Sequence, residues 1–183
     1  TNLFSQLLTF VLFVVWMRLL TPVQFGILAT FQAFLPLGEN IIDQGSTASL
    51  GREYFDVKKS GVSLGDYIFH SLLIKLFFAA VFFLLLWIFS APLKQTYQFP
   101  VWVLGSLPLL CLMMAVSNMV SRIWIVQQQA LTYGGFLVFR VGLGMLLSIF
   151  CVMAFTRWEG RVVGLIIAEW LGVGFSLLYL FRS

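Results

Sequence analysis

The stretch LFFAAVFFLLLWIF, residues 76–89, is an unbroken apolar run that decides the fold class. Strands of a membrane β-barrel alternate apolar and polar residues, which this run does not do. A helix needs about 20 predominantly apolar residues to cross a hydrocarbon core about 30 Å thick. Together with its flanks the run is long enough, and it therefore predicts a membrane-spanning α-helix near residues 68–90.

The composition extends this prediction to the whole chain. Of the 183 residues, 61% are hydrophobic and 10% are charged, whereas about a quarter of the residues of a soluble domain are charged. A chain of this length holds roughly six spans with short connections. We therefore expect an all-α membrane protein, a six-transmembrane-helix bundle. Its spans are predicted near residues 2–20, 24–45, 68–90, 101–121, 134–155 and 162–181.

The loop charges do not decide the orientation of these spans. The side of the membrane that holds the N-terminus carries five basic residues: Arg52, Lys58, Lys59, Arg122 and Arg182. The opposite side carries four: Arg18, Lys94, Arg157 and Arg161. This difference is too small for the positive-inside rule, although it favours a cytoplasmic N-terminus.

Four ionisable side chains fall inside the predicted spans, where charges are costly and usually serve a function. They are Glu39, Lys75, Arg140 and Glu169. With a rise of 1.5 Å per residue, the first three share one level, whereas Glu169 lies about 11 Å from Arg140 along the membrane normal. We therefore expect a polar layer of Glu39, Lys75 and Arg140 facing a central cavity, and no direct pair between Arg140 and Glu169.

Polar residues at helical spacing support a wet cleft between the spans. Span two carries Gln32, Pro36, Glu39 or Asn40, and Asp43, span five carries Arg140, Gly144 and Ser148, and span one carries Asn2, Ser5, Gln6 and Thr9. The alternative is that Lys75 and Glu39 neutralise each other while Arg140 reaches the lipid headgroups. In that case the centre of the bundle is dry.

Span six carries a ladder of small residues at every fourth position. The ladder consists of Gly160, Gly164, Ala168, Gly172 and Ser176. Small faces let membrane helices approach closely, so we expect this face to pack against a neighbouring helix. A groove facing a substrate is the other interpretation.

The residues favour binding or transport over covalent chemistry. His70 is the single histidine, and Cys111 and Cys151 lie in separate spans without the spacing of metal ligands. The stretch GVSLG, residues 61–65, matches the G-x-S-x-G nucleophile motif but lacks its strand-turn-helix setting. We predict no catalytic residue, metal or cofactor. Because the basic residues are scattered, we expect membrane lipid or an anionic substrate as partner, and no nucleic acid.

Two motifs carry a resemblance to a known family. The stretch RLLTPVQFG, residues 18–26, resembles the R-x-L-(G/T)-P-x-x-(Y/F)-G signature of bacterial polysaccharide and O-antigen flippases, which belong to the multidrug, oligosaccharidyl-lipid and polysaccharide exporter superfamily. A second stretch, with Asp43, Gly45, Ala48 and Arg52, is similar to the family's D-x-G…A…R segment. The matching positions of the first motif are Arg18, Pro22 and Gly26.

The resemblance implies the N-terminal lobe of a twelve- to fourteen-helix carrier with alternating access, and the second lobe is absent from this chain. We expect a longer protein, because the chain begins at Thr1 and is apolar from Leu3. The implied location is the bacterial inner membrane. The implied substrate is an undecaprenyl-diphosphate-linked oligosaccharide, flipped from the cytoplasmic to the periplasmic leaflet. Other polysaccharide assembly proteins are expected as partners.

Depth and charge, rather than the family motifs, nominate the site residues. Because a diphosphate is anionic, we expect contacts from Lys75, Arg140 and, at the cytoplasmic mouth, Arg122. Candidates for coupling to protons or sodium are Glu39, Asp43 and Glu169.

Three other functions remain open. A multidrug or lipid II exporter of the same superfamily fits the same architecture. A membrane-embedded glycosyltransferase or polymerase is an enzymatic alternative, but it needs acidic or histidine residues in a sizeable loop, and the longest predicted loop, residues 51–65, is short. A structural subunit of a membrane complex needs no buried charges.

Overall fold

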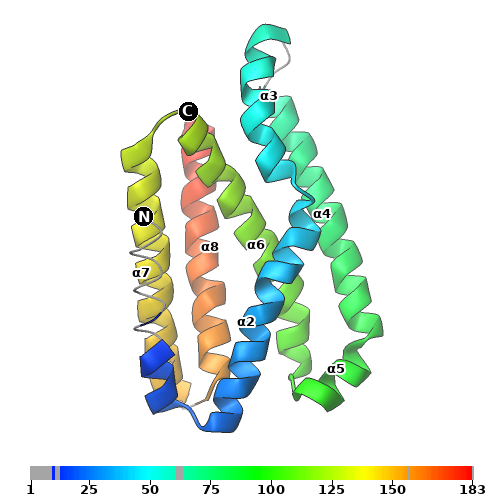
Figure 1. The fold of residues 1–183 in the computed structure, drawn as a ribbon, viewed down its shortest axis with the longest axis vertical. Coiled ribbons are helices and arrows are strands. Elements are labelled where there is room, and N and C mark those ends of the chain that lie inside the picture. The colour runs from blue at the N-terminus through cyan, green and yellow to red at the C-terminus, as the bar shows by residue number, and fades with distance from the viewer. Residues whose placement is uncertain (1–9, 11–12, 61–63, 156, 183) are drawn as a thin grey trace.

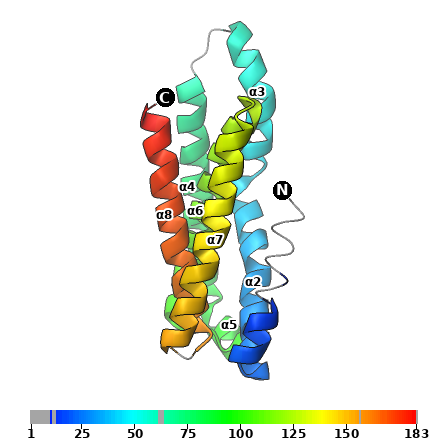
Figure 2. The same ribbon diagram turned by 90° about the vertical axis from the view of Figure 1, so that its left-hand side faces the viewer.

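The chain folds into a bundle of long helices. The computed structural model describes residues 10, 13–60, 64–155 and 157–182, where all regular secondary structure is helical. Residues 13–19 form a helical segment that precedes the other helices. These helices are α2 (Pro22–Asp43), α3 (Ser46–Ser60), α4 (Leu64–Ile88), α5 (Ser90–Tyr97), α6 (Val101–Val126), α7 (Ala130–Phe155) and α8 (Glu159–Arg182). All except α5 run along the long axis of the molecule (Figures 1 and 2). The predicted all-α class is confirmed.

Four of the described helices are long and apolar enough to cross a membrane. They are α2, residues 65–88 of α4, α6 and α7. Together with the apolar composition, they make the chain a multi-pass membrane protein. Helix α8 is not among the four, and residues 1–9 and 11–12 of the first predicted span lie outside the described residues. The count of six spans therefore stays a prediction.

The prediction of a loop over residues 51–65 is wrong for most of its length. Helix α3 occupies residues 46–60 and rises beside the start of α4 at the top of Figure 1. Its sequence is polar, so a prediction based on apolar runs does not detect it. The motif residues 61–63 lie outside the described part of the chain. Helix α4 ends at Ile88, close to the predicted end of its span at residue 90. The short helix α5, which contains Pro92, follows it.

Helix α6 is the central element of the bundle. It contacts α2, α3, α4, α7 and α8. In its most apolar stretch of 18 residues, 67% of the residues are buried, compared with 22–28% in the corresponding stretches of α2, α4 and α7. The outer helices expose large side chains such as Phe77 and Trp87 of α4, which are 64% and 66% exposed. Continuous apolar surfaces of this kind are rare on soluble proteins and are suited to contact with lipid.

Helices α7 and α8 pack closely as an antiparallel pair, with the small-residue ladder of α8 against α7. A methyl group added at Gly160 would lie 2.5 Å from the carbonyl oxygen of Cys151, and one added at Gly164 would lie 2.6 Å from Cα of Ser148. The Cβ of Ala168 lies 3.6 Å from the position that a Cβ on Gly144 would take. The predicted packing of this face against a neighbouring helix is confirmed.

Gly164→Ala is therefore expected to destabilise the protein. Its methyl group would have to displace α7 backbone, and overpacking of this kind lowers the free energy of unfolding by about 1–3 kcal/mol. Gly174→Ala on the same helix is the matched control, because a methyl group there meets nothing within 4 Å. Thermal or detergent unfolding of the two purified variants measures the difference. Equal stability of both variants would contradict the close approach of the two helices.

Candidate functional site

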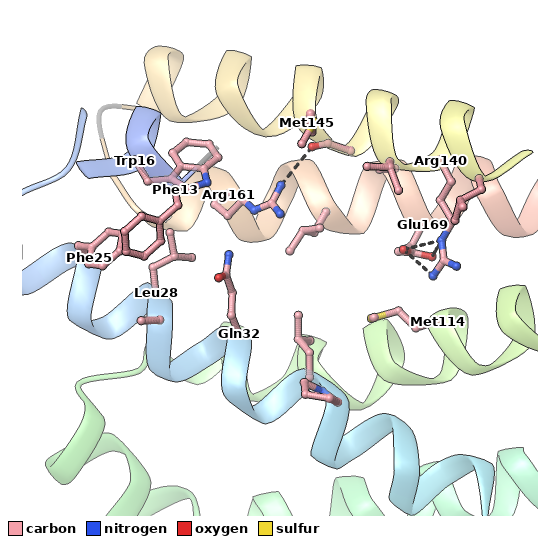
Figure 3. A pocket seen from close by; sticks show the side chains of 18 residues that line it. Phe13, Trp16, Phe25, Leu28, Gln32, Met114, Arg140, Met145, Arg161 and Glu169 are labelled. Atoms are coloured by element: carbon pink, nitrogen blue, oxygen red, sulfur yellow. Dashed lines mark hydrogen bonds and ion pairs between the residues drawn. The ribbon is translucent and has the colours of Figure 1, made fainter. Parts of the chain in front are cut away.

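A cavity of about 440 Å³ lies between residues 13–19, α2, α7 and α8. Its volume lies within the usual range of small-molecule sites, about 300–1,000 Å³. Most of its lining is apolar, including Phe13, Phe25, Leu28, Met114 and Met145 (Figure 3). Among the described residues, four polar side chains also line it: Gln32, Arg140, Arg161 and Glu169. The cavity therefore suits a ligand with an apolar part and a charged part.

Arg140 is held at one end of the cavity by a network that joins four helices. Its Nη2 lies 2.9 Å from Oε1 of Glu169, and its Nε donates to both carboxylate oxygens at 3.0 and 3.1 Å. Its Nη1 donates to Oδ1 of Asn118 at 2.9 Å, and the Asn118 amide donates in turn to Glu39. These charge-assisted bonds connect α7, α8, α6 and α2.

The prediction that Arg140 and Glu169 do not pair is wrong. Gly164 lies opposite Ser148, and Ala168 lies opposite Gly144. Continued by one residue, this antiparallel register places Glu169 opposite residue 143, three residues or about 4.5 Å from Arg140. Two long side chains span that offset easily. The larger separation expected from the sequence came from counting each helix from an assumed membrane surface.

Lys75 belongs to a second, separate polar cluster. Its Nζ donates to Asp43, to Oγ of Ser46 at 2.5 Å and to Oγ1 of Thr47 at 3.3 Å. The side chain of Lys75 is fully buried, whereas that of Asp43 is 19% exposed. Lys75 does not line the cavity. Glu39 does not line it either, so of the predicted layer only Arg140 faces the cavity. The alternative pairing of Lys75 with Glu39 is also wrong, because Lys75 pairs with Asp43 and Glu39 accepts from Asn118.

The break between α2 and α3 explains this second cluster. Gln44 and Gly45 adopt left-handed backbone conformations, with φ of 46° and 73°, which turn the chain and are easiest for glycine. Asp43 accepts hydrogen bonds from the Thr47 amide at 3.4 Å and from the Ser46 hydroxyl at 3.3 Å. The second motif thus caps α3 and places a carboxylate beside Lys75.

The first motif forms the turn into α2. Thr21 is the N-cap, and its Oγ1 accepts from the Gln24 amide at 3.4 Å while Oε1 of Gln24 accepts from the Thr21 amide at 3.4 Å. Pro22 is the first residue of the helix, where its missing N–H is not needed. Arg18 is exposed, and a Cβ added at Gly26 would meet nothing within 4 Å. Neither of these two residues lines the cavity.

The two remaining predicted arginines lie near α3, away from the cavity. The guanidinium of Arg122 packs against Gly51 of α3, and a Cβ added at Gly51 would lie 3.2 Å from Nη2 of Arg122. Arg52 is exposed on α3. Neither Arg122 nor Arg52 lines the cavity.

Arg161 is a site residue that sequence reasoning placed in a loop. It lies in the first turn of α8, where its Nη1 donates to the carbonyl of Gly144 at 3.2 Å and to the hydroxyl of Ser148. Its guanidinium carbon lies 5.6 Å from the centre of the Trp16 ring. The spacing of Arg161, Leu165 and Glu169 along one helix face was the signal that could have placed it in the site.

The lining of the cavity carries an excess of positive charge. Arg140 and Arg161 contribute two positive charges, and Glu169 contributes one negative charge. Arginine binds phosphate and carboxylate groups through its fork of N–H donors. The arrangement can therefore hold an anionic group next to an apolar chain.

Comparison with known proteins identifies one match. A family model described as polysaccharide biosynthesis protein matches residues 1–183, the full length of the chain. No curated protein and no solved structure matches it.

The buried pair of Lys75 and Asp43 leads to an asymmetric expectation for stability. Asp43→Asn leaves a fully buried ammonium without its counter-charge, and we expect a loss of about 3 kcal/mol or more in the free energy of unfolding. Lys75→Met is expected to cost less, because the partly exposed Asp43 carboxylate keeps its bonds to Ser46 and Thr47.

Unfolding of the purified variants in detergent measures these differences. Asp66→Asn is the control, since Asp66 is exposed in the first turn of α4 and its removal costs less than about 1 kcal/mol. A larger loss for Lys75→Met than for Asp43→Asn would contradict the burial of the ammonium.

Proposed function

The chain belongs to the polysaccharide biosynthesis protein family, and from that premise we propose that it forms part of a flippase for a lipid-diphosphate-linked oligosaccharide. The family membership connects the chain with the biosynthesis of polysaccharide. In the proposed function the substrate moves from the cytoplasmic to the periplasmic leaflet of the bacterial inner membrane. The chain supplies one lobe of the carrier, and a second lobe completes the pathway by alternating access.

The observation that carries this proposal is the cavity with an excess positive charge inside a bundle of membrane helices. A polar headgroup cannot cross hydrocarbon without losing its hydrogen bonds to water, which is costly. A cavity lined by Gln32, Arg140, Arg161 and Glu169 offers replacement partners. Its apolar walls suit the lipid chain that carries the headgroup.

The polar clusters suggest a division of roles among the predicted site residues. Arg140 and Glu169 line the cavity, which supports their place on the substrate pathway. Lys75 and Asp43 neutralise each other where α2, α3 and α4 meet, so we assign them to holding that junction. Coupling to an ion through Glu39, Asp43 or Glu169 and contact between Arg122 and substrate stay proposals. Association with other polysaccharide assembly proteins is also a proposal.

Filling the cavity is expected to abolish export. Ala29 of α2 lines the cavity, and Ala29→Trp would occupy space that the substrate needs. In a strain deleted for the gene, complementation with this variant should leave the cell surface without polysaccharide and lipid-linked oligosaccharide accumulated in the cytoplasmic leaflet. Immunoblotting measures the surface polysaccharide, and mass spectrometry of extracted lipids measures the accumulated lipid-linked oligosaccharide.

Ala80→Trp is the matched control, because Ala80 is exposed on α4 and does not line the cavity. We expect it to restore display, with both variants present in the membrane at equal amounts. Normal display with Ala29→Trp would contradict passage through this cavity. Normal display in the deletion strain itself would contradict the proposed function.

A further inference from the structure

We propose that Arg161 is the residue that binds the phosphate groups of the substrate, at the end of the cavity away from the Arg140–Glu169 pair. This inference rests on the proposed flippase function and names the contact residue within that site. It replaces the expectation from the sequence that Lys75 and Arg140 make this contact. The ligand chemistry is a phosphate or diphosphate ester.

Among the described residues that line the cavity, Arg161 is the cation without a carboxylate partner. Arg140 is already bonded by three contacts to the Glu169 carboxylate. Lys75 is fully buried against Asp43. Within the described residues, Arg161 forms no ion pair with a carboxylate. Glu159 is two residues away on the same helix, and side chains at that spacing do not face each other.

The guanidinium of Arg161 is already held in position for a ligand. The Gly144 carbonyl and the Ser148 hydroxyl hold its Nη1, and the Trp16 ring lies close to its guanidinium carbon. Its Nε is buried and has no hydrogen-bond partner in the part of the chain that the structure describes. An unmade bond of a buried charged donor is unfavourable, so each such group calls for an explanation. A phosphate oxygen would supply the missing acceptor.

The surroundings of Arg161 suit a phosphate that carries a lipid chain. Figure 3 shows the Gln32 amide reaching from α2 toward the guanidinium across the cavity. This amide makes no hydrogen bond with another described residue, so it is free to donate to a second phosphate oxygen. Phe13, Phe25 and Leu28 form the apolar wall next to it. Headgroup and chain thus find their partners within one cavity.

A binding titration tests the assignment. The whole protein, reconstituted in phosphatidylcholine nanodiscs, is titrated with farnesyl diphosphate and with inorganic pyrophosphate by calorimetry. We expect Arg161→Gln to weaken binding at least about tenfold, since a hydrogen bond to a charged group contributes about 1.5–3 kcal/mol. Arg157→Gln is the matched control, because Arg157 is exposed and outside the cavity. It should bind like the wild type.

A second variant leaves Arg161 and its helix contacts unchanged. Gln32→Glu places a carboxylate opposite the guanidinium and neutralises it, so binding should weaken to a similar extent. This variant separates loss of the anion site from misfolding of Arg161→Gln. Unaltered affinity in both Arg161→Gln and Gln32→Glu would overturn the proposal.

The two sources of phosphate and the two proposals are also distinguishable. If replacing part of the phosphatidylcholine by phosphatidylglycerol lowers the affinity of wild type, but not of Arg161→Gln, the site accepts lipid headgroups. Unchanged affinity assigns it to the diphosphate alone, and both results support an anion site at Arg161.

If surface display of polysaccharide requires the gene but binding does not depend on Arg161 or Gln32, this inference alone is overturned. Binding that depends on Arg161, with normal display in the deletion strain, overturns the flippase function alone.

Discussion

The close approach of α7 and α8 is the constraint on which the site depends. Gly160 and Gly164 leave no room for a side chain against the α7 backbone, and this contact sets the register of the two helices. That register brings Glu169 within reach of Arg140 and places Arg161 beside Gly144 and Ser148. In hydrocarbon, ionised groups without such partners are strongly unfavourable. A shift of one helix along the other would therefore break packing and electrostatics together.

The sequence was sufficient to predict the fold class but not all of its helices. Apolar runs such as residues 76–89 identify helices that cross hydrocarbon, because only there does hydropathy report the environment. Helix α3 has a polar sequence and escaped that signal. Helices α6, α7 and α8 also extend beyond the spans predicted for them, because backbone hydrogen bonding does not stop where the apolar residues end.

The site was harder to predict because its partners depend on register and on turn geometry. The sequence placed Arg140 and Glu169 at different depths. The small residues that begin at Gly160 mark the face of α8 that packs against α7, and the register of that contact brings Arg140 and Glu169 together. Lys75 pairs with Asp43 because the left-handed turn at Gln44 redirects the chain. Hydropathy does not predict such a turn. Arg161 was assigned to a loop because α8 was expected to begin three residues later than it does.

The contact between Trp16 and Arg161 has a consequence for residues 13–19, which contribute Phe13 and Trp16 to the lining of the cavity. Residues 13–19 rest on this cation–π contact and on the edge-to-face contact of Phe13 with Phe25, whose ring centres are 5.1 Å apart. An anion that neutralised the guanidinium would weaken its attraction for the indole ring. The strength of the contact between Trp16 and Arg161 is therefore expected to differ between the empty and the anion-bound cavity.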